Sequence, residues 1–368
     1  MYLKRLSILN FKNCSEADIN FSHNINCFVG DNGEGKTNIL DAIYYLSFCK
    51  SFFNSIDNQN IKHNEPFFVI QGYYINNKNE DDTIYCGLKR NQKKHFKLNE
   101  NTYSKLADHI GLYPLVMVSP SDIEIISGGS EERRRFINGV ISQYDKHYLS
   151  DVIEYTKAVT LRNSLLKQFA KNKQEDYESI ELINDKLIEF GTKIYLKRKQ
   201  FISDFKPIFE KHYKYISDNK EDIDLIYETN VDIENYSNLL KSSYEKDKIL
   251  QYTTVGIHKD DLDFSLTNYP IKKIGSEGQK KSYLIALKLA KFDFIKNMTS
   301  YKPILLLDDI FDKLDDKRVA KIITLVKGNN FGQIFITDTN SNRIEDVIAK
   351  LTDEYAIFNV KDGIISPK

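Results

Sequence analysis

The sequence predicts an α/β fold in which a β-rich lobe and a later strand–helix–strand segment are separated by an inserted helical arm. Short alternating apolar runs dominate the first part of the chain, and long charged stretches with apolar residues at helical spacing follow. After residue 250 strands and helices alternate, and strands joined through a helix run parallel. We therefore expect an α/β head formed by residues 1–130 and 250–368, and a helical arm formed by 131–249.

Length and composition describe a globular protein of about two domains. The chain has 368 residues, 41% of them hydrophobic, which is enough for a sizeable core. Lys plus Arg and Asp plus Glu both number 52, so the net charge is zero and any polyanion-binding surface must be local. The four cysteines form no CxxC pair, which disfavours a zinc site or a disulfide framework. Without a signal-like or 18-residue apolar run, we expect a cytoplasmic protein with no membrane span.

The head begins with strands and one helix. Apolar residues recur every second or third position from Leu3 to Phe11, and two further runs at Ala17–Phe21 and Ile25–Val29 also predict strands. A helix is expected from Asn38, because apolar residues follow at helical spacing. Later strands are expected at Phe67–Tyr74, Ile84–Arg90, His95–Leu98 and Leu115–Val118.

The arm is predicted from apolar residues at helical spacing within charged sequence, interrupted only at Pro207. Its charges segregate into a basic stretch from Lys193 to Lys214 and an acidic stretch from Asp218 to Glu234. In the second part of the head, a helix is expected from Ser282. It is followed in the prediction by a strand at Ile304–Leu307, a helix at Lys317–Lys327 ending at Gly328, and a strand at Ile334–Thr337.

The segment from Gly30 to Thr37 matches the P-loop pattern GxxxxGK[ST], placed between a strand and a helix. Its glycines let backbone N–H groups point at phosphate oxygens, and the helix N-terminus adds a favourable dipole. Lys36 would contact the β- and γ-phosphates, and the Thr37 hydroxyl would ligate Mg²⁺. The residues expected to bind ATP are Gly30, Asp31, Asn32, Gly33, Glu34, Gly35, Lys36, Thr37 and Asn38.

A second acidic site for the magnesium follows the apolar run Ile304–Leu307. This arrangement has the form of a Walker B element, because a buried strand delivers two carboxylates at its C-terminal end. Asp308 would hold Mg²⁺, and Asp309 would orient or deprotonate the attacking water. Lys36 and Asp309 are thus the expected catalytic residues.

A turn with the sequence Gly275-Ser276-Glu277-Gly278-Gln279 precedes a helix. Such a turn can present a hydroxyl, backbone N–H groups and the positive end of a helix dipole to an anion. Since one P-loop already holds the phosphates of its own subunit, a second phosphate-binding corner suggests two subunits that face each other. The alternative interpretation is an ordinary N-capped helix.

Together these motifs resemble the ABC-type ATPase heads of the SMC and RecF group, and more narrowly the RecF family of DNA replication and repair. The motifs shared with the group are Asn10-Phe11-Lys12, Gly30–Asn38, Ser276-x-Gly278-Gln279, Asp308-Asp309 and Asp312-Lys313-Leu314-Asp315. Segments similar to the RecF family in particular are Val118–Ile123, Gly128–Asn138 and Val255–Leu262. The resemblance covers essentially the whole chain, in family order and spacing.

The resemblance implies an ATP-dependent homodimer that clamps DNA at gaps or junctions and works with RecO and RecR. It also implies that Ser276, Gly278 and Gln279 of one copy contact the γ-phosphate held by Lys36 of the other, with Asp315 near the partner's site. Hydrolysis should be slow and should release the clamp. The sequence departs from ABC transporters, because it carries Asp309 instead of the usual Glu and lacks a histidine after its last parallel strand.

Two basic stretches are candidates to contact DNA phosphates, although a solvated charged face is the more common explanation of either stretch taken alone. The candidate residues are Lys89, Arg90, Lys93, Lys94, Lys193, Lys197, Arg198 and Lys199. The consecutive Arg133, Arg134 and Arg135 point in three directions on a helix, so at least one should be structural. His258 beside two aspartates is expected to be structural rather than a metal ligand.

Two other functions would use a P-loop. A transporter motor is disfavoured by the inserted arm and the missing histidine, and co-purification with a membrane component would support it. A small-molecule kinase would require an acceptor pocket and phosphate transfer to a metabolite rather than to water.

Overall fold

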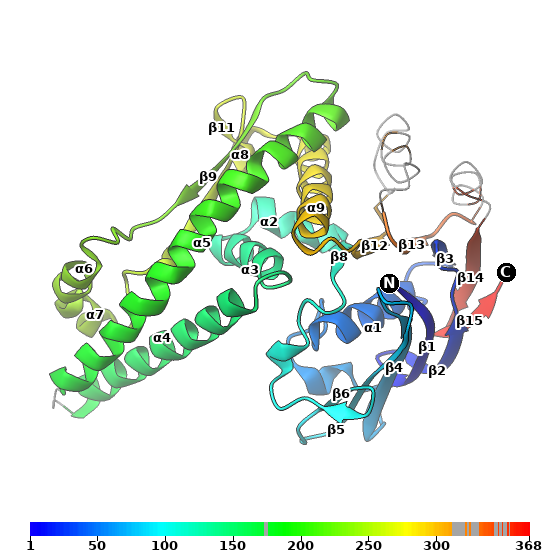
Figure 1. Ribbon diagram of the computed structural model, residues 1–368, viewed down its shortest axis with the longest axis horizontal. Helices are drawn as coiled ribbons and strands as arrows, with labels where there is room; N and C mark the ends of the chain where they lie inside the picture. Colours follow the sequence, from blue (N-terminus) through cyan, green and yellow to red (C-terminus); the bar gives the residue numbers. More distant parts are fainter. Residues whose placement is uncertain are drawn as a thin grey trace. The chain divides into compact units, whose positions relative to one another are not determined.

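The computed structural model describes most of the chain, which divides into two compact units (Figure 1). The described residues are 1–172, 176–310, 331–341 and 354–368, together with Lys321, Thr324, Glu345, Ile348 and Thr352. One unit comprises Met1–Asp122 and Ile285–Lys368, and the other comprises Ile123–Leu284. The expected helix at Lys317–Lys327 lies largely outside the described residues.

The second unit is longer than the arm expected at 131–249. The extension arises because β10 (Asp261–Leu266) pairs antiparallel with β9 (Ile223–Glu228), which ties the segment after residue 250 to the arm. At the other end, α2 (Glu124–Ser127) packs on α3 (Ser130–Ile141) and α8 (Ile271–Ile274). Strand pairing and helix packing between segments distant in sequence therefore define this unit.

In its described part, the first unit contains an antiparallel sheet of six strands in the order β2-β1-β4-β5-β6-β7. Apolar side chains alternate along it: Phe68 and Ile70 of one strand, and Ile84 and Cys86 of the next, are all buried. The predicted strands of the β-rich lobe are confirmed. The strands are β1 (Tyr2–Phe11), β2 (Cys14–Asn20), β4 (Phe67–Ile75), β5 (Asp81–Lys89), β6 (His95–Leu98) and β7 (Asn101–Thr102).

The other sheet of this unit has, in the described residues, the order β15-β14-β3-β13-β12-β8. All neighbouring strands run parallel except the edge strand β15. Every residue of β3, β12 and β13 is buried, which is typical of parallel strands covered on both faces. The strands are β3 (Ile25–Val29), β8 (Leu115–Val118), β12 (Ile304–Asp308), β13 (Ile334–Asp338), β14 (Tyr355–Lys361) and β15 (Ile364–Pro367).

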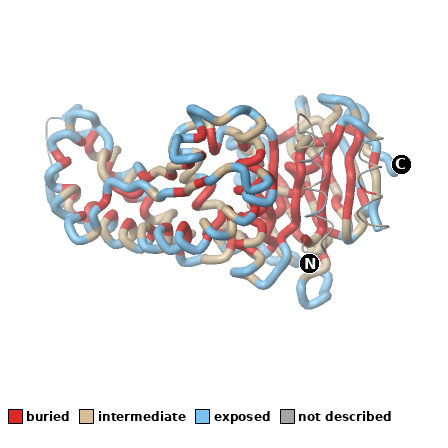
Figure 2. Tube along the Cα trace, turned by 90° about the horizontal axis from the view of Figure 1, so that it is seen from above, coloured by how far each residue is buried: buried red, intermediate tan, exposed pale blue. Residues whose placement is uncertain are grey.

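Helix α1 (Lys36–Phe48) shares one hydrophobic core with both sheets. Its buried side chains include Ile39, Ile43 and Leu46, which repeat at the spacing that predicted the helix. Figure 2 shows buried residues concentrated along the strands of this unit. The core thus fixes the start of α1, where the P-loop ends. Short 3₁₀ turns lie at η1 (Asp57–Asn60), η2 (Leu106–Asp108) and η3 (Pro120–Ile123).

The second unit is built on two long helices that pack against each other, α4 (Lys146–Asn172) and α5 (Tyr177–Ser217). Helix α5 continues through Pro207, where an interruption was expected. A three-stranded sheet in the described residues, β11-β10-β9, completes the unit with β11 (Tyr269–Pro270). The unit also contains the short helices α6 (Tyr236–Ser242) and α7 (Tyr244–Leu250), and a 3₁₀ turn, η4 (Ile257–Lys259).

Helix α9 (Glu277–Thr299) supplies residues to both units. It begins five residues before the expected start at Ser282, because the preceding turn already caps it. Within the described part of the chain, each helix is too short or too polar to span a lipid bilayer.

Candidate nucleotide-binding site

The P-loop connects β3 to α1 and needs its glycines for geometric reasons. Gly33 and Gly35 have φ angles of 90° and 109°, a conformation that side chains disfavour. A Cβ atom on Gly35 would lie 2.5 Å from Nδ2 of Asn13, and one on Gly30 would lie 2.2 Å from the carbonyl oxygen of Val360. The motif is therefore a tightly packed loop at a helix start, with Gly35 as the N-cap of α1.

Lys36 is drawn into this loop. Its Nζ atom donates to the carbonyl oxygens of Gly30 (2.8 Å) and Asp31 (2.9 Å), and the residue is only 4% exposed. Glu34 anchors the loop on the other side, where its carbonyl oxygen accepts from Gly363 N (2.9 Å) and its carboxylate accepts from Asp362 N. The ammonium group is thus held beside the backbone that would surround phosphates.

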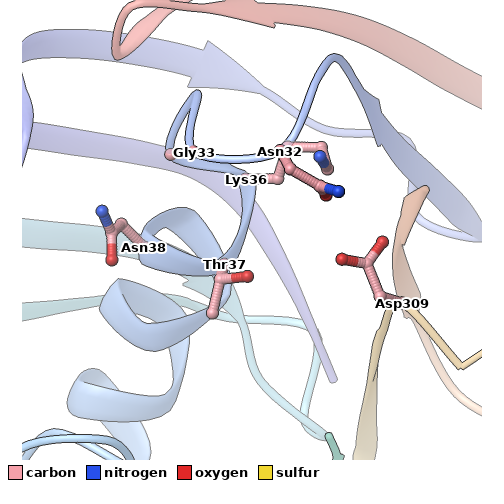
Figure 3. Close-up of a pocket in the computed structure, with 7 residues that line it drawn as sticks. Asn32, Gly33, Lys36, Thr37, Asn38 and Asp309 are labelled. Carbon is pink, nitrogen blue, oxygen red and sulfur yellow. The ribbon is translucent and has the colours of Figure 1, made fainter. Parts of the chain in front are cut away.

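A pocket of about 220 Å³ opens at the P-loop (Figure 3). Figure 3 shows Thr37 and Asp309 pointing toward the same space from opposite sides. The structure therefore brings the carboxylate after β12 to the loop after β3, as the sequence predicted. The lining residues are Asn32, Gly33, Gly35, Lys36, Thr37, Asn38 and Asp309.

Asp308 is buried, and hydroxyl groups surround its carboxylate. Its Oδ1 atom accepts from Thr37 Oγ1 (2.9 Å) and from Thr337 Oγ1 (2.8 Å), and its Oδ2 atom accepts from Ser119 Oγ (3.4 Å). Burial is the main cause that raises the pKa of Asp308 above its usual value, and the neighbouring Asp309 raises it further. Among the described residues, no cation contacts this carboxylate, so its donor set fits a divalent metal ion with oxygen ligands.

Asp309 and Thr337 complete this corner of the site. Asp309 has a positive φ of 46°, and its N–H donates to Thr337 Oγ1 (3.0 Å). Thr337 bonds to both aspartates, because its Oγ1 atom accepts from Asp309 N and donates to Asp308 Oδ1. The sequence did not assign it, and its place at the C-terminal end of a central parallel strand is the signal that could have done so.

The predicted corner at Ser276 forms a reciprocal capping box at the start of α9. Ser276 N donates to Gln279 Oε1 (2.8 Å), and Gln279 N donates to Ser276 Oγ (3.3 Å). Gln279 Nε2 also donates to Glu221 Oε1 (2.7 Å). The N-capped helix is thus present, with Gly278 half-buried within it and Ser276 exposed. Asp315 lies outside the described residues.

The structure corrects the choice of Arg198 as a DNA contact. Its side chain is 2% exposed and donates to Asp260 Oδ2 (2.7 Å), Ile257 O (2.8 Å) and Tyr148 Oη (3.1 Å). Because these bonds occupy the guanidinium inside the second unit, Arg198 has a structural role. On the same helix, Lys193 pairs with Glu189 (2.7 Å), Lys197 pairs with Asp145 (2.7 Å), and Lys199 is exposed.

Lys94 is also tied into the fold rather than free for a phosphate. It pairs with Asp57 (2.8 Å) and donates to Cys49 O (2.6 Å), and its side chain is 14% exposed. The neighbouring Lys89 and Lys93 are exposed. Arg90 is exposed as well, but its Nε atom donates to Glu65 O (3.0 Å).

At least one arginine of the triplet was expected to be structural, and two of the three are bonded across the fold, as is the buried ring of His258. Arg133 pairs with Asp261 (2.6 Å), Arg134 donates to Asp260 O (2.6 Å), and Arg135 pairs with glutamates of its own helix. Burial lowers the pKa of His258 to about 4, and its ring contacts Tyr155 Oη (2.9 Å). Within the residues that the structure describes, no cluster of three or more His, Cys, Asp or Glu side chains could hold a metal.

The P-loop after β3 and the two aspartates at the end of β12 define the head of an SMC/RecF-type ATPase. The family model described as "RecF/RecN/SMC N terminal domain" matches residues 2–366. An Smc head bound to the C-winged helix domain of ScpA has the same fold, with a TM-score of 0.59 at 17% identity over 100% of this chain and 97% of that chain.

Comparison with full-length relatives identifies the family within this class of ATPase. The chain is 51% identical to "DNA replication and repair protein RecF" of Phocaeicola vulgatus over 370 residues, covering 100% of this chain and 99% of the relative. It is 49% identical to the protein of the same name from Flavobacterium johnsoniae, covering 98% and 100%. A solved structure described as the recombination mediator protein RecF-ATP in the RecFOR pathway superposes with a TM-score of 0.90 at 31% identity, covering 100% and 97%. The chain belongs to the RecF family.

Proposed function

We propose that this chain is an ATP-dependent DNA-binding protein that acts as a nucleotide-gated dimeric clamp in recombinational repair and replication restart. The observation that carries the proposal is the pocket where Lys36, Thr37 and Asp309 converge beside Asp308. The names of the RecF relatives, which refer to DNA replication and repair, support this assignment. Slow, Mg²⁺-dependent ATP hydrolysis would release the clamp.

Within one subunit, the loop N–H groups and the N-terminus of α1 bind the phosphates, and Lys36 leaves its two carbonyl acceptors to contact the β- and γ-phosphates. Thr37 and Asp308 hold Mg²⁺, which neutralises charge on the phosphates when it is bound. Asp309 faces the pocket and orients the attacking water. Thr337 fixes the backbone of Asp309 and one oxygen of Asp308.

A second copy of the chain completes each site. Ser276, Gly278 and Gln279 at the start of α9 contact the γ-phosphate bound by the other copy. Support comes from the exposed Ser276 hydroxyl at the N-terminus of a 23-residue helix, whose dipole favours an anion. Gln279 Nε2 would exchange its bond to Glu221 for one to the phosphate held by the other copy.

DNA is the proposed polyanionic partner, at gaps or junctions, and RecO and RecR are proposed protein partners. The name of the RecFOR pathway in the solved relative supports those partners. Exposed lysines on α5 that could contact phosphates are Lys193, Lys199, Lys211 and Lys214. Each neutralised phosphate would steepen the dependence of DNA affinity on salt.

The test compares DNA affinity and sedimentation with ATP, with ADP and with a non-hydrolysable ATP analogue. The proposal expects a dimer and tight DNA binding with ATP or the analogue, and a monomer with weak DNA binding with ADP. A chain that stays monomeric at high concentration with ATP and Mg²⁺ would contradict the clamp. DNA binding that does not change with the nucleotide would contradict gating.

The DNA surface is tested by reversing the charge of Lys199, Lys211 and Lys214 together. We expect weaker DNA binding and a salt slope reduced by about one per lost phosphate contact. The matched control is Lys157→Glu, an exposed lysine on α4 that is paired with Glu154. A slope equal to that of the parent would show that this face of α5 does not touch DNA.

A further inference from the structure

Both carboxylate oxygens of Asp308 accept hydrogen bonds from hydroxyl groups. Of the residues that donate these bonds, the sequence assigned only Thr37 to the metal site. Thr37 Oγ1 and Thr337 Oγ1 both donate to Oδ1. The other oxygen, Oδ2, accepts from Ser119 Oγ at 3.4 Å, and Ser119 is 3% exposed. No motif in the sequence assigned a role to Ser119, which lies 189 residues away from its partner.

Strand pairing explains why Ser119 reaches this carboxylate. β8 runs parallel to β12, with Val118 opposite Leu307, so Ser119 and Asp308 follow at the same edge of the sheet. Ser119 is itself fixed, because its N–H donates to Asp122 Oδ2 (2.8 Å) and its carbonyl oxygen accepts from Asp122 N (3.0 Å). Asp122 thus closes a tight turn that holds the serine in place.

The turn rests on a buried ion pair. Asp122 Oδ1 accepts from Lys288 Nζ of α9 at 2.5 Å, and the two side chains are 6% and 4% exposed. Lys288 Nζ also donates to the carbonyl oxygen of Met117 (3.0 Å), which lies in β8 two residues before Ser119. A buried ion pair gives little or no net stability compared with apolar residues of similar size, so stability alone does not account for it.

We propose that Ser119 is a positioning residue of the magnesium site, and that the Asp122–Lys288 pair holds it in place. Ser119 bonds to Oδ2 of Asp308, so that Oδ1 and the Thr37 hydroxyl, 2.9 Å apart, would be the groups that hold the metal. Groups that orient metal ligands in this way typically change metal affinity by 10–100-fold when they are removed. This inference rests on the proposed function of the P-loop site.

The test measures nucleotide binding, not hydrolysis, as a function of Mg²⁺. A fluorescent ATP analogue is titrated onto the full chain in EDTA and at increasing Mg²⁺, and the Mg²⁺ concentration at half-maximal tightening is recorded. The variants are Ser119→Ala, Ser119→Thr, which keeps the hydroxyl, and Lys288→Met, which keeps the length of the side chain. Lys296→Met, on the same helix but partly exposed, is the control.

We expect Ser119→Ala and Lys288→Met to raise the Mg²⁺ midpoint about tenfold, with affinity in EDTA within twofold of the parent. Ser119→Thr and Lys296→Met should keep the parent's midpoint. A purely structural role would lower affinity in EDTA and the melting temperature without moving the midpoint. If Lys288→Met does not fold, the pair of serine variants still decides the matter.

The same titration distinguishes a failure of the positioning role of Ser119 from a failure of the proposed metal site. If the parent tightens with Mg²⁺ and Ser119→Ala has the parent's midpoint, the positioning role is overturned while the proposed function stands. If the parent binds the analogue equally with and without Mg²⁺, the metal site of the proposed function is overturned, and the role of Ser119 falls with it.

Discussion

The change Lys36→Met tests the P-loop quantitatively. The ammonium donates two hydrogen bonds within the loop, to Gly30 O at 2.8 Å and to Asp31 O at 2.9 Å. Bonds to charged phosphate oxygens contribute about 1.5–3 kcal/mol each, and bonds to neutral carbonyls contribute about 1 kcal/mol each. Exchanging two of the second kind for two of the first gives a net effect of about 1–4 kcal/mol. We therefore expect Lys36→Met to weaken ATP binding about 5- to 850-fold, with about 100-fold near the middle of the range.

The assay is the melting temperature with and without ATP and Mg²⁺, alongside direct calorimetric binding. At an ATP concentration 100 times the parent's Kd, ligand binding stabilises the parent by about 2.7 kcal/mol. With binding weakened about 100-fold, the same ATP would stabilise Lys36→Met by only about 0.4 kcal/mol. Without ATP, Lys36→Met should melt slightly below the parent, because it loses the two hydrogen bonds to Gly30 O and Asp31 O, so the comparison uses the ATP-induced shift of each protein.

Lys4→Met, an exposed lysine on β1, is the control and should bind ATP as the parent does. AMP, which lacks the β- and γ-phosphates, should be affected least by the loss of Lys36. A loss of ATP affinity below threefold would refute the placement of Lys36 on the phosphates. An equal loss for AMP and ATP would refute it as well.

Other predictions follow from single groups. Asp309→Asn should bind ATP like the parent but hydrolyse it at least tenfold more slowly, because a neutral amide cannot accept the proton of water; single-turnover kinetics measures this. Arg198→Met should destabilise the second unit by about 3–5 kcal/mol in urea unfolding, because it leaves Asp260 buried without its cation. Burial lowers the pKa of His258 to about 4, so stability should be lost as the pH falls from about 6.5 toward 4, since only the unfolded state binds a proton there. His258→Gln should flatten this acid limb in melting experiments.

For each of these three predictions, one result would contradict the reasoning. Parent-like hydrolysis by Asp309→Asn would remove its catalytic role. Parent-like unfolding of Arg198→Met would show that the ion pair with Asp260 does not stabilise the fold. An acid limb that persists in full in His258→Gln would place the acid sensitivity in other groups.

The P-loop and the two aspartates could be predicted from the sequence because each motif is local and has strict backbone requirements. Gly33 and Gly35 adopt positive φ angles, and the run Ile304–Leu307 forms a strand buried on both faces. The position of Ser119 could not be predicted, because its role depends on β8 lying next to β12, far away in the sequence. The longer second unit has the same cause, since pairing of β10 with β9 is a contact between distant segments.

The prediction that Arg198 contacts DNA was wrong because it relied on the charge of the stretch alone. A basic stretch suggests a DNA-binding surface, but a helix turns consecutive residues to different faces. Arg198 follows Ile194 by four residues and precedes Phe201 by three, so it lies on the buried stripe of α5. Helical spacing within the stretch, rather than its charge, was the informative signal. For Lys94, the partner Asp57 comes from a 3₁₀ turn, and no local pattern indicates that contact.

If two copies of the chain share each ATP, two variants that are each inactive should complement one another when they are mixed. Lys36→Met lacks the phosphate-binding lysine, and Ser276→Arg places a bulky side chain at the start of α9. A mixed dimer would contain one intact composite site, so we predict that combining the two proteins restores ATP-dependent dimerisation and measurable hydrolysis, although neither protein has them alone. If the folded mixture is no more active than the sum of its parts, the two segments do not act on the same nucleotide from different subunits.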